Sequence, residues 1–299
     1  AATAGTGNIG IGRSAAGSIT TALSNIAIGT SALGNITTEH RNIGIGNHTL
    51  SNSTSSHSIA IGRSAGNFHR SGHDNIFIGT YTARGESVNY TYTGSDNVII
   101  GTETAMDLDE DNDQNTIIGS KAAASLTGGG NRNILLGYAT DVQTATTSDH
   151  LNIGNLIYGD LANEDFIVGS YQLDDTGTGT EDNRLFFDKS KGAFRAGGVS
   201  GTQWDSTNVG TSSIALGSEV QVNASNSFAA GRLLTVSGAQ SIALGNEVDV
   251  SGINSMAISL GNQSARPDVS ANSSLGIFLG DESGYDLTTS NRMALVGGD

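Results

Sequence analysis

The sequence predicts an all-β protein, a repetitive parallel β-solenoid or β-roll, and two observations carry this prediction. First, a short phrase recurs ten times between Gly12 and Gly169: an Asn, two aliphatic residues one position apart, and a closing Gly. Second, the intervals between the closing glycines are 17, 17, 16, 17, 22, 18, 18, 17 and 15 residues. A short, nearly constant period is typical of stacked coils that bury their apolar edges only against each other.

The composition agrees with this fold class and excludes several functions. Gly accounts for 42 of 299 residues, Pro occurs once and Cys is absent. A chain that turns a corner every few residues needs Gly, because Gly reaches positive φ without steric cost. The net charge of −15, with only 14 Lys and Arg, argues against nucleic-acid binding. No apolar run approaches the roughly 18 residues of a membrane span, so we expect no membrane insertion.

An N-terminal solenoid array with a period of about 17 residues is predicted over residues 1–170. Its anchor glycines begin with Gly12, Gly29 and Gly46. The residues three and one before each anchor are aliphatic and point to one face of a short strand. A small residue three positions after the anchor, such as Ala32, is expected to point inward. The position four before the anchor is Asn in seven coils, which predicts a ladder of side-chain amide hydrogen bonds: Asn8, Asn25, Asn42, Asn75, Asn97, Asn115 and Asn133.

A second array, predicted over residues 211–299, has a period of about 14 and is looser after residue 261. Gly217, Gly231 and Gly245 close its regular units, and each follows a Ser by four positions. Residues 171–210 form a non-repeating junction that is rich in aromatic residues and holds the single Trp, Trp204. We interpret the junction as a packing region between two solenoids, in preference to a binding site.

The unit Ser-aliphatic-Ala-Leu-Gly-x-x-Val-x-Val, found in SIALG at 213–217 and 241–245, resembles the YadA-like head repeat of trimeric autotransporter adhesins. Two further segments are similar to bacteriophage tail fibre and tail spike proteins. They are residues 183–210 of the junction with the unit that follows, and NIAIGTSALGN at 25–35. The resemblance implies a β-roll in an intertwined or side-by-side homotrimer that forms an elongated fibre. A narrow coil also has too little interior to exclude water from both faces, which favours a trimer independently.

We therefore expect a non-catalytic structural and receptor-binding component of a phage tail fibre, located on the virion tail. Its expected partners are two further copies of the chain, other tail or baseplate proteins, and a host surface glycan or protein. The first alternative is a trimeric autotransporter-type adhesin on a bacterial cell surface. The second is a polysaccharide-cleaving tail spike, but no pair of carboxylates is singled out and no catalytic motif is present.

The longest interval, between Gly79 and Gly101, holds the candidate receptor contacts Tyr81, Tyr90 and Tyr92. Insertions in a solenoid map to loops on one face, and exposed aromatic side chains suit stacking on sugars. The alternative is that this loop packs on a neighbouring chain.

Two groups of residues are candidate metal ligands, although no cofactor is expected. Alternate carboxylates at Asp107, Asp109, Asp111 and Asp113 resemble the start of a calcium loop. The Gly and Glu that an EF-hand requires are missing, so we favour a solvated acidic turn over loose Ca²⁺ binding. His40, His57 and His73 recur in three successive coils, which allows an axial metal in a trimer, but their polar neighbours favour surface histidines.

Overall fold

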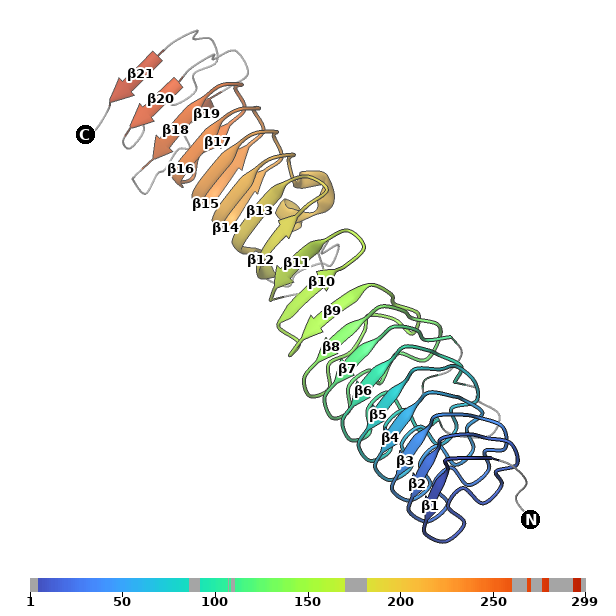
Figure 1. Ribbon diagram of the computed structural model, residues 1–299. Helices are drawn as coiled ribbons and strands as arrows, with labels where there is room; N and C mark the ends of the chain where they lie inside the picture. Colours follow the sequence, from blue (N-terminus) through green and yellow to red (C-terminus); the bar gives the residue numbers. More distant parts are fainter. Residues whose placement is uncertain are drawn as a thin grey trace. The chain divides into compact units, whose positions relative to one another are not determined.

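The computed structural model of the protein describes residues 5–85, 92–106, 108, 111–169, 182–259, 268–269, 276–279 and 293–296. The chain divides into two compact units, Ala1–Ala162 and Asn163–Asp299. Both are built from short β-strands, and the fold is the all-β parallel solenoid that the sequence predicts (Figure 1). No helix among the described residues has the length and apolar character needed to cross a membrane.

Unit 1 is a stack of coils that each contribute one strand of three or four residues to a parallel sheet. Each strand from β1 to β9 pairs in register with the next, so that Ile9 lies beside Ile26 and Ile26 beside Ile43. A short antiparallel pair, β9–β10, ends this unit. The strands are β1 (Ile9–Ile11), β2 (Ile26–Ile28), β3 (Ile43–Ile45), β4 (Ile59–Ile61), β5 (Ile76–Ile78), β6 (Val98–Ile100), β7 (Thr116–Ile118), β8 (Ile134–Leu136), β9 (His150–Ile153) and β10 (Ile157–Asp160).

Unit 2 begins with antiparallel strands and continues as a parallel roll. β11 (Asp165–Val168), β12 (Asp182–Asp188) and β13 (Ala193–Val199) pair antiparallel, and β13 then pairs in parallel with β14 (Ile214–Val222). Two 3₁₀ helices, η1 (Thr202–Trp204) and η2 (Ser206–Asn208), lie between β13 and β14. The remaining strands, all parallel, are β15 (Phe228–Val236), β16 (Ile242–Asn246), β17 (Asp249–Val250), β18 (Met256–Ser259), β19 (Asp268–Val269), β20 (Gly276–Leu279) and β21 (Met293–Val296).

The corner glycines are required by the contact between coils as well as by their backbone angles. Gly29 has a φ of 129°, and a Cβ placed there would lie 2.5 Å from the carbonyl oxygen of Gly46 in the next coil. In unit 2 the same collision is closer, because a Cβ on Gly231 would lie 1.8 Å from the carbonyl oxygen of Gly245. Any other residue at these positions would force successive coils apart.

The core of unit 1 contains the middle residue of each strand and the small residue three positions after the anchor glycine. Ala27, Phe77 and Ile117 at the middle position are fully buried, and Ala32 and Thr82 at the second position are fully buried as predicted. The two aliphatic residues of the repeated phrase therefore point outward. Ile61 and Ile118 keep 37% and 40% of their surface exposed. We call the residues three and one before each anchor in β1–β8, all aliphatic except Thr116, the outer aliphatic face.

The asparagine ladder predicted from the sequence is present and runs in one direction. The Asn42 N–H donates to Oδ1 of Asn25 at 2.9 Å, and the Asn115 N–H donates to Oδ1 of Asn97 at 2.9 Å. Each Nδ2 group also donates to a backbone carbonyl of the next coil, as Asn115 does to Gly130 at 3.0 Å. These amides are buried, so each fills donor and acceptor positions that water does not reach. In unit 2 serines take this role, and the Ser255 N–H donates to Oγ of Ser241 at 3.0 Å.

Replacing one ladder amide should destabilise unit 1 well beyond an exposed substitution. Asn115→Ala leaves the buried N–H of Asn133 and the carbonyl of Gly130 without their side-chain partners. We expect a loss of about 3 kcal/mol in the free energy of unfolding, since each unsatisfied buried group costs about 1–3 kcal/mol. Urea unfolding followed by circular dichroism measures this loss. Asn35→Ala is the control, because Asn35 bonds Asn52 at the surface and should change stability little; equal losses would contradict the ladder's role.

Candidate functional site

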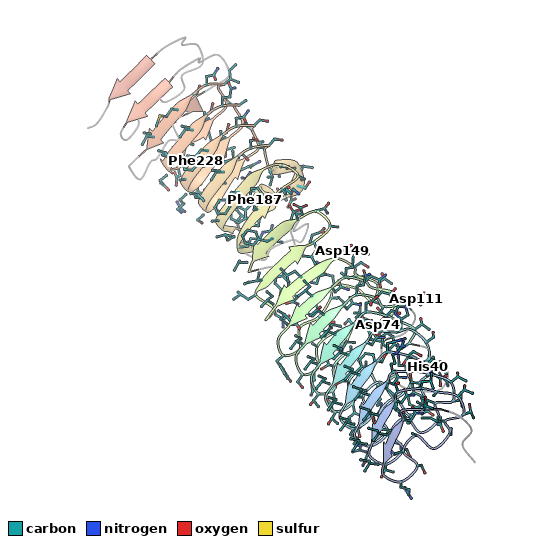
Figure 2. All side chains as sticks on the ribbon, in the orientation of Figure 1. His40, Asp74, Asp111, Asp149, Phe187 and Phe228 are labelled. Atoms are coloured by element: carbon teal, nitrogen blue, oxygen red, sulfur yellow. The ribbon has the colours of Figure 1, made fainter. Side chains whose placement is uncertain are left out.

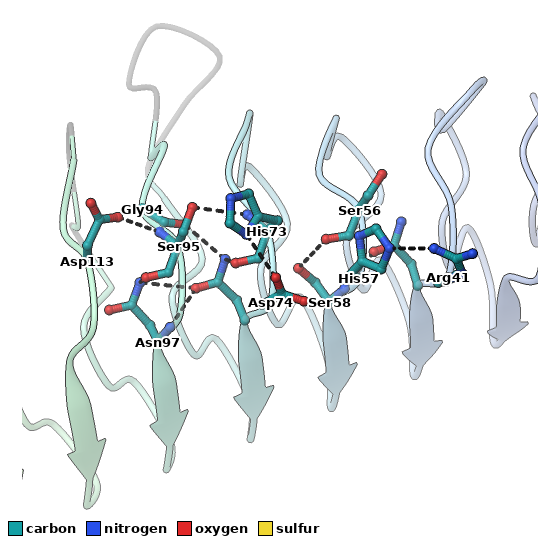
Figure 3. A network of polar contacts seen from close by, with 12 residues as sticks. Arg41, Ser56, His57, Ser58, His73, Asp74, Gly94, Ser95, Asn97 and Asp113 are labelled. Carbon is teal, nitrogen blue, oxygen red and sulfur yellow. Dashed lines mark hydrogen bonds and ion pairs between the residues drawn. The ribbon is translucent and has the colours of Figure 1, made fainter.

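The corner that precedes the strands of unit 1 gathers polar side chains from successive coils (Figures 2 and 3). Figure 2 shows Asp74, Asp111 and Asp149 along one edge of the stack, and Figure 3 shows His73 and Asp74 where β5 begins. Nδ1 of His73 lies 2.9 Å from Oδ2 of Asp74, and both side chains are more than half exposed. The backbone holds the corner firmly, because the Asp96 N–H donates to the carbonyl of His73 at 3.0 Å.

Among the described residues, His73, Asp74 and Asp96 are the group whose side chains could together hold a metal ion. Their nearest ligand atoms all lie within 4.8 Å of one another, and all three residues are exposed. One imidazole and two carboxylates suit a divalent cation. The other two histidines of the sequence hypothesis have contacts of their own within the chain, and the axial metal that the hypothesis allows in a trimer stays a prediction. His40 accepts from the Leu23 N–H at 2.9 Å, and His57 lies 2.9 Å from Nη1 of Arg41.

The acidic run is described only in part, since Asp107 and Asp109 lie outside the described residues. Oδ1 of Asp113 accepts from the Ser95 N–H at 2.6 Å, and Asp111 accepts from the Thr93 hydroxyl. Both carboxylates thus bind the preceding coil. Calcium binding by this run stays a prediction.

The three candidate tyrosines have different environments. Tyr92 is only 1% exposed, so the expectation that it lies on an exposed loop is wrong. Its hydroxyl accepts from Nδ2 of Asn97 at 2.8 Å, and burial raises its pKa. Tyr81 is half-buried, with the Cζ atoms of Arg63 and Arg84 each 5.1 Å from its ring centroid. Tyr90 lies outside the described residues.

A buried histidine, His69, lies next to Tyr92, with the two ring centroids 4.8 Å apart. His69 is fully buried, packs edge-on against Phe77 with ring centroids 5.5 Å apart, and its Nε2 lies 3.0 Å from the carbonyl of Gly94. Burial lowers its pKa to about 4, an effect that the hydrogen bond to Gly94 partly opposes. The neutral imidazole is therefore part of the core where the longest interval enlarges the coil.

Unit 2 contains a cleft of about 180 Å³ beside its aromatic cluster. Phe186 and Trp204 are each 1% exposed and meet edge-on with ring centroids 5.8 Å apart, as the packing interpretation of the junction predicts. Around them the cleft offers carboxylates and hydroxyls, groups that hydrogen-bond the hydroxyls of a sugar. Its lining residues are Asp165, Phe186, Asp188, Ser190, Trp204, Ser206 and Val209.

Sequence reasoning did not single out the polar residues of this cleft. Oδ1 of Asp165 accepts from the Lys189 N–H at 2.6 Å, and Oδ1 of Asp188 accepts from the Ser190 hydroxyl at 2.6 Å. Because β11 and β12 pair across a long sequence separation, no local pattern brings these residues together. Only the density of aromatic residues over 183–210 pointed to this region.

Comparisons with known proteins do not assign the chain to a family. No family model matches it, and no curated protein matches it. A solved structure that it resembles weakly is the crystal structure of the polySia specific acetyltransferase NeuO, with 12% identity and a TM-score of 0.10 over 95% of this chain and 84% of that chain. A likeness this poor carries no conclusion about fold or activity.

Acid should destabilise unit 1 through His69. The unfolded chain binds a proton near pH 6.5 and the folded chain only near pH 4, so stability falls as the pH drops through this window. We expect a loss of about 1.4 kcal/mol per pH unit and about 3 kcal/mol in total. Urea midpoints of the wild type and of His69→Phe, measured between pH 7.5 and 4, isolate this contribution. Parallel pH profiles of the two proteins would refute it.

Proposed function

We propose that the protein is a homotrimeric β-solenoid fibre that attaches to a bacterial surface as the receptor-binding component of a phage tail fibre or tail spike, without catalysing a reaction. The proposal places it on the virion tail, in contact with other tail or baseplate proteins and with a host surface glycan or protein. The observation that carries it is the outer aliphatic face of unit 1.

This face presents apolar side chains that no part of a single chain covers among the described residues. Its first strand exposes 48% of Ile9 and 58% of Ile11, and Ile118 in β7 is still 40% exposed. In-register pairing lines these residues up in two continuous columns along the stack. Contiguous apolar patches of this kind mark interaction surfaces, because leaving them in water is unfavourable.

A second outward apolar column in unit 2 supports the same assembly. Phe166 pairs with Phe187 and Phe187 with Phe194, and the column continues through Ile214 and Phe228. Phe166 and Phe187 remain 42% and 36% exposed. Within each unit taken by itself, three copies that turn this face toward an axis give its columns a partner, and cyclic symmetry closes the assembly.

The cleft of unit 2 supports contact with a glycan. Its two carboxylates are held by backbone or hydroxyl donors, and its hydroxyls lie on exposed residues around an aromatic floor. A volume of about 180 Å³ is below the usual range for drug-sized ligands and suits a single sugar ring. Because Tyr92 is buried, this cleft is a better candidate for the glycan contact than the interval between Gly79 and Gly101.

A charge on the outer aliphatic face should dissociate the trimer. Native mass spectrometry of the wild type is expected to give three chains, and Ile118→Lys to give one chain with an unchanged circular dichroism spectrum. The expectation follows because a lysine buried between apolar faces loses its hydration. Ala124→Lys adds the same charge to an exposed position of the same coil and should remain trimeric. A wild type that stays monomeric at all concentrations would contradict the proposed function.

Filling the cleft should abolish glycan binding and leave the assembly intact. Ser190→Tyr places a ring in the cleft, and we expect at least a tenfold loss of signal for the ligands that the wild type binds on a bacterial glycan array. Ser200→Tyr, at an exposed serine that does not line the cleft, is the control. Unchanged binding by Ser190→Tyr would remove the cleft from the receptor contact.

A further inference from the structure

Two edges border the outer aliphatic face of unit 1, and they carry opposite charges halfway along the stack. We call the corner that precedes each strand the leading edge and the corner that follows each anchor glycine the trailing edge. On the leading edge, Asp74 precedes β5 and Asp96 precedes β6, and both are exposed. On the trailing edge, Arg63 follows β4 and Arg84 follows β5, and the Cζ atom of each lies 5.1 Å from the ring centroid of Tyr81.

Several other charged residues on these edges are neutralised or contacted within the chain. The contacts are Arg132 Nη2 to Asp149 Oδ2 at 2.6 Å, Lys121 Nζ to Glu103 Oε2 at 3.9 Å, and Arg41 Nη1 to His57 Nε2 at 2.9 Å. Among the described residues, Arg63 and Arg84 take part in no ion pair, and neither does Asp96. Asp74 has His73 as its partner.

Like charges are therefore adjacent on each edge. The carboxylates of Asp74 and Asp96 belong to successive coils, and with His73 their nearest ligand atoms lie within 4.8 Å. The Cζ atoms of Arg63 and Arg84 both lie 5.1 Å from the centroid of one tyrosine ring, and Nε of Arg84 also donates to the carbonyl of Gly85 at 3.4 Å. Each arrangement repels itself in a single chain and is relieved by opposite charges from outside.

We propose that the trailing edge of one chain meets the leading edge of the next, so that Arg63 and Arg84 form ion pairs with the partner's Asp74 and the partner's Asp96. This inference rests on the proposed homotrimer and names the contact that joins its chains. In a cyclic assembly whose stacks lie parallel to the symmetry axis, the strands of all chains circulate around the axis in one sense, so the trailing edge of each chain adjoins the leading edge of the next. The occupant is thus a second copy of this chain.

The heights of the four residues along the stack agree with this pairing. Arg63 and Arg84 follow β4 and β5, whereas Asp74 and Asp96 precede β5 and β6. Neighbouring strands lie about 4.8 Å apart, so the two sets of charges are offset by about one coil, within the reach of an arginine side chain. The aliphatic columns repeat nearly identically from coil to coil and specify no axial register. Among the described residues, two arginines without an ion pair and two adjacent carboxylates face these edges together at this height, so they add a specific contact to an otherwise uniform face.

Charge reversal tests this pairing in the full chain. We expect either double reversal to raise the trimer dissociation constant at least tenfold at 50 mM salt, whether it is Arg63→Glu/Arg84→Glu or Asp74→Lys/Asp96→Lys. The fourfold variant that combines them should restore the wild-type constant. Sedimentation velocity over a dilution series, in buffer with EDTA, measures the constants. Raising the salt to 0.5 M should shrink the differences, because exposed ion pairs are screened. The control reverses an ion pair that lies within one chain, Arg132→Glu/Asp149→Lys, and should leave the constant unchanged.

Each alternative outcome overturns the inference in a recognisable way. A wild-type trimer that neither double reversal weakens would refute the pairing and leave the proposed trimer standing. A trimer that EDTA and Asp74→Lys/Asp96→Lys weaken, but Arg63→Gln/Arg84→Gln does not, would assign the carboxylates to a divalent cation instead. Circular dichroism confirms that each variant is folded, and the neutral Arg63→Gln/Arg84→Gln variant should weaken the trimer less than the reversal.

Discussion

The contact between one coil and the next, closed by a buried side-chain amide, is the interaction on which the rest of unit 1 depends. Each Asn accepts a backbone N–H and donates to a backbone carbonyl of the following coil, so the corner before every strand is held at the strand spacing. The anchor glycines close the other corner, where a side chain would collide with the next coil. Between two corners fixed in this way the strand has room for three residues. Only the middle one faces inward, and this forces the aliphatic pair outward.

The same constraint explains how the core tolerates inward residues of very different size. The middle position holds Ala27 in one coil, Phe77 in another and Ile117 in a third, all fully buried. Around Phe77 the coil cannot widen at its corners, and the chain instead contributes His69 and Tyr92 from the turns to the same aromatic cluster. The longest interval is thus partly an enlargement of the core, which a hypothesis based on loop length alone does not anticipate.

Sequence reasoning predicted what repeats and missed what occurs once. The period, the glycine corners, the amide ladder and the inward small residue all recur, so each coil supports the same interpretation of its neighbours. The buried middle residue was missed because its identity varies, and Tyr92 because a single tyrosine carries no pattern. The first coil of the roll was also missed. Arg195 lies in register with Ala215, and Gly197 with Gly217, but the interval of 20 residues and the arginine depart from the repeat of the later coils. The cleft depends on pairing between distant strands, which a local pattern does not contain.

The coil that contains β13 shows how a roll built from small inward residues accommodates a buried arginine in its first turn. This coil is paired with β12 on one side and with β14 on the other, and its backbone N–H groups already bond carbonyls of the next coil, as Phe194 does to Ser213 at 2.9 Å. In place of the alanine found in later coils, Arg195 is fully buried and donates to the carbonyls of Phe194, Ser213 and Val222 and to the Ser213 hydroxyl. Burial lowers its pKa to about 10, so it remains a cation at neutral pH. Trp204 is also buried in this region and donates to the carbonyl of Val220 at 2.9 Å. The buried charge is tolerated here because the two Nη groups of Arg195 find four acceptors, whereas the alanine at this position in the later coils needs none.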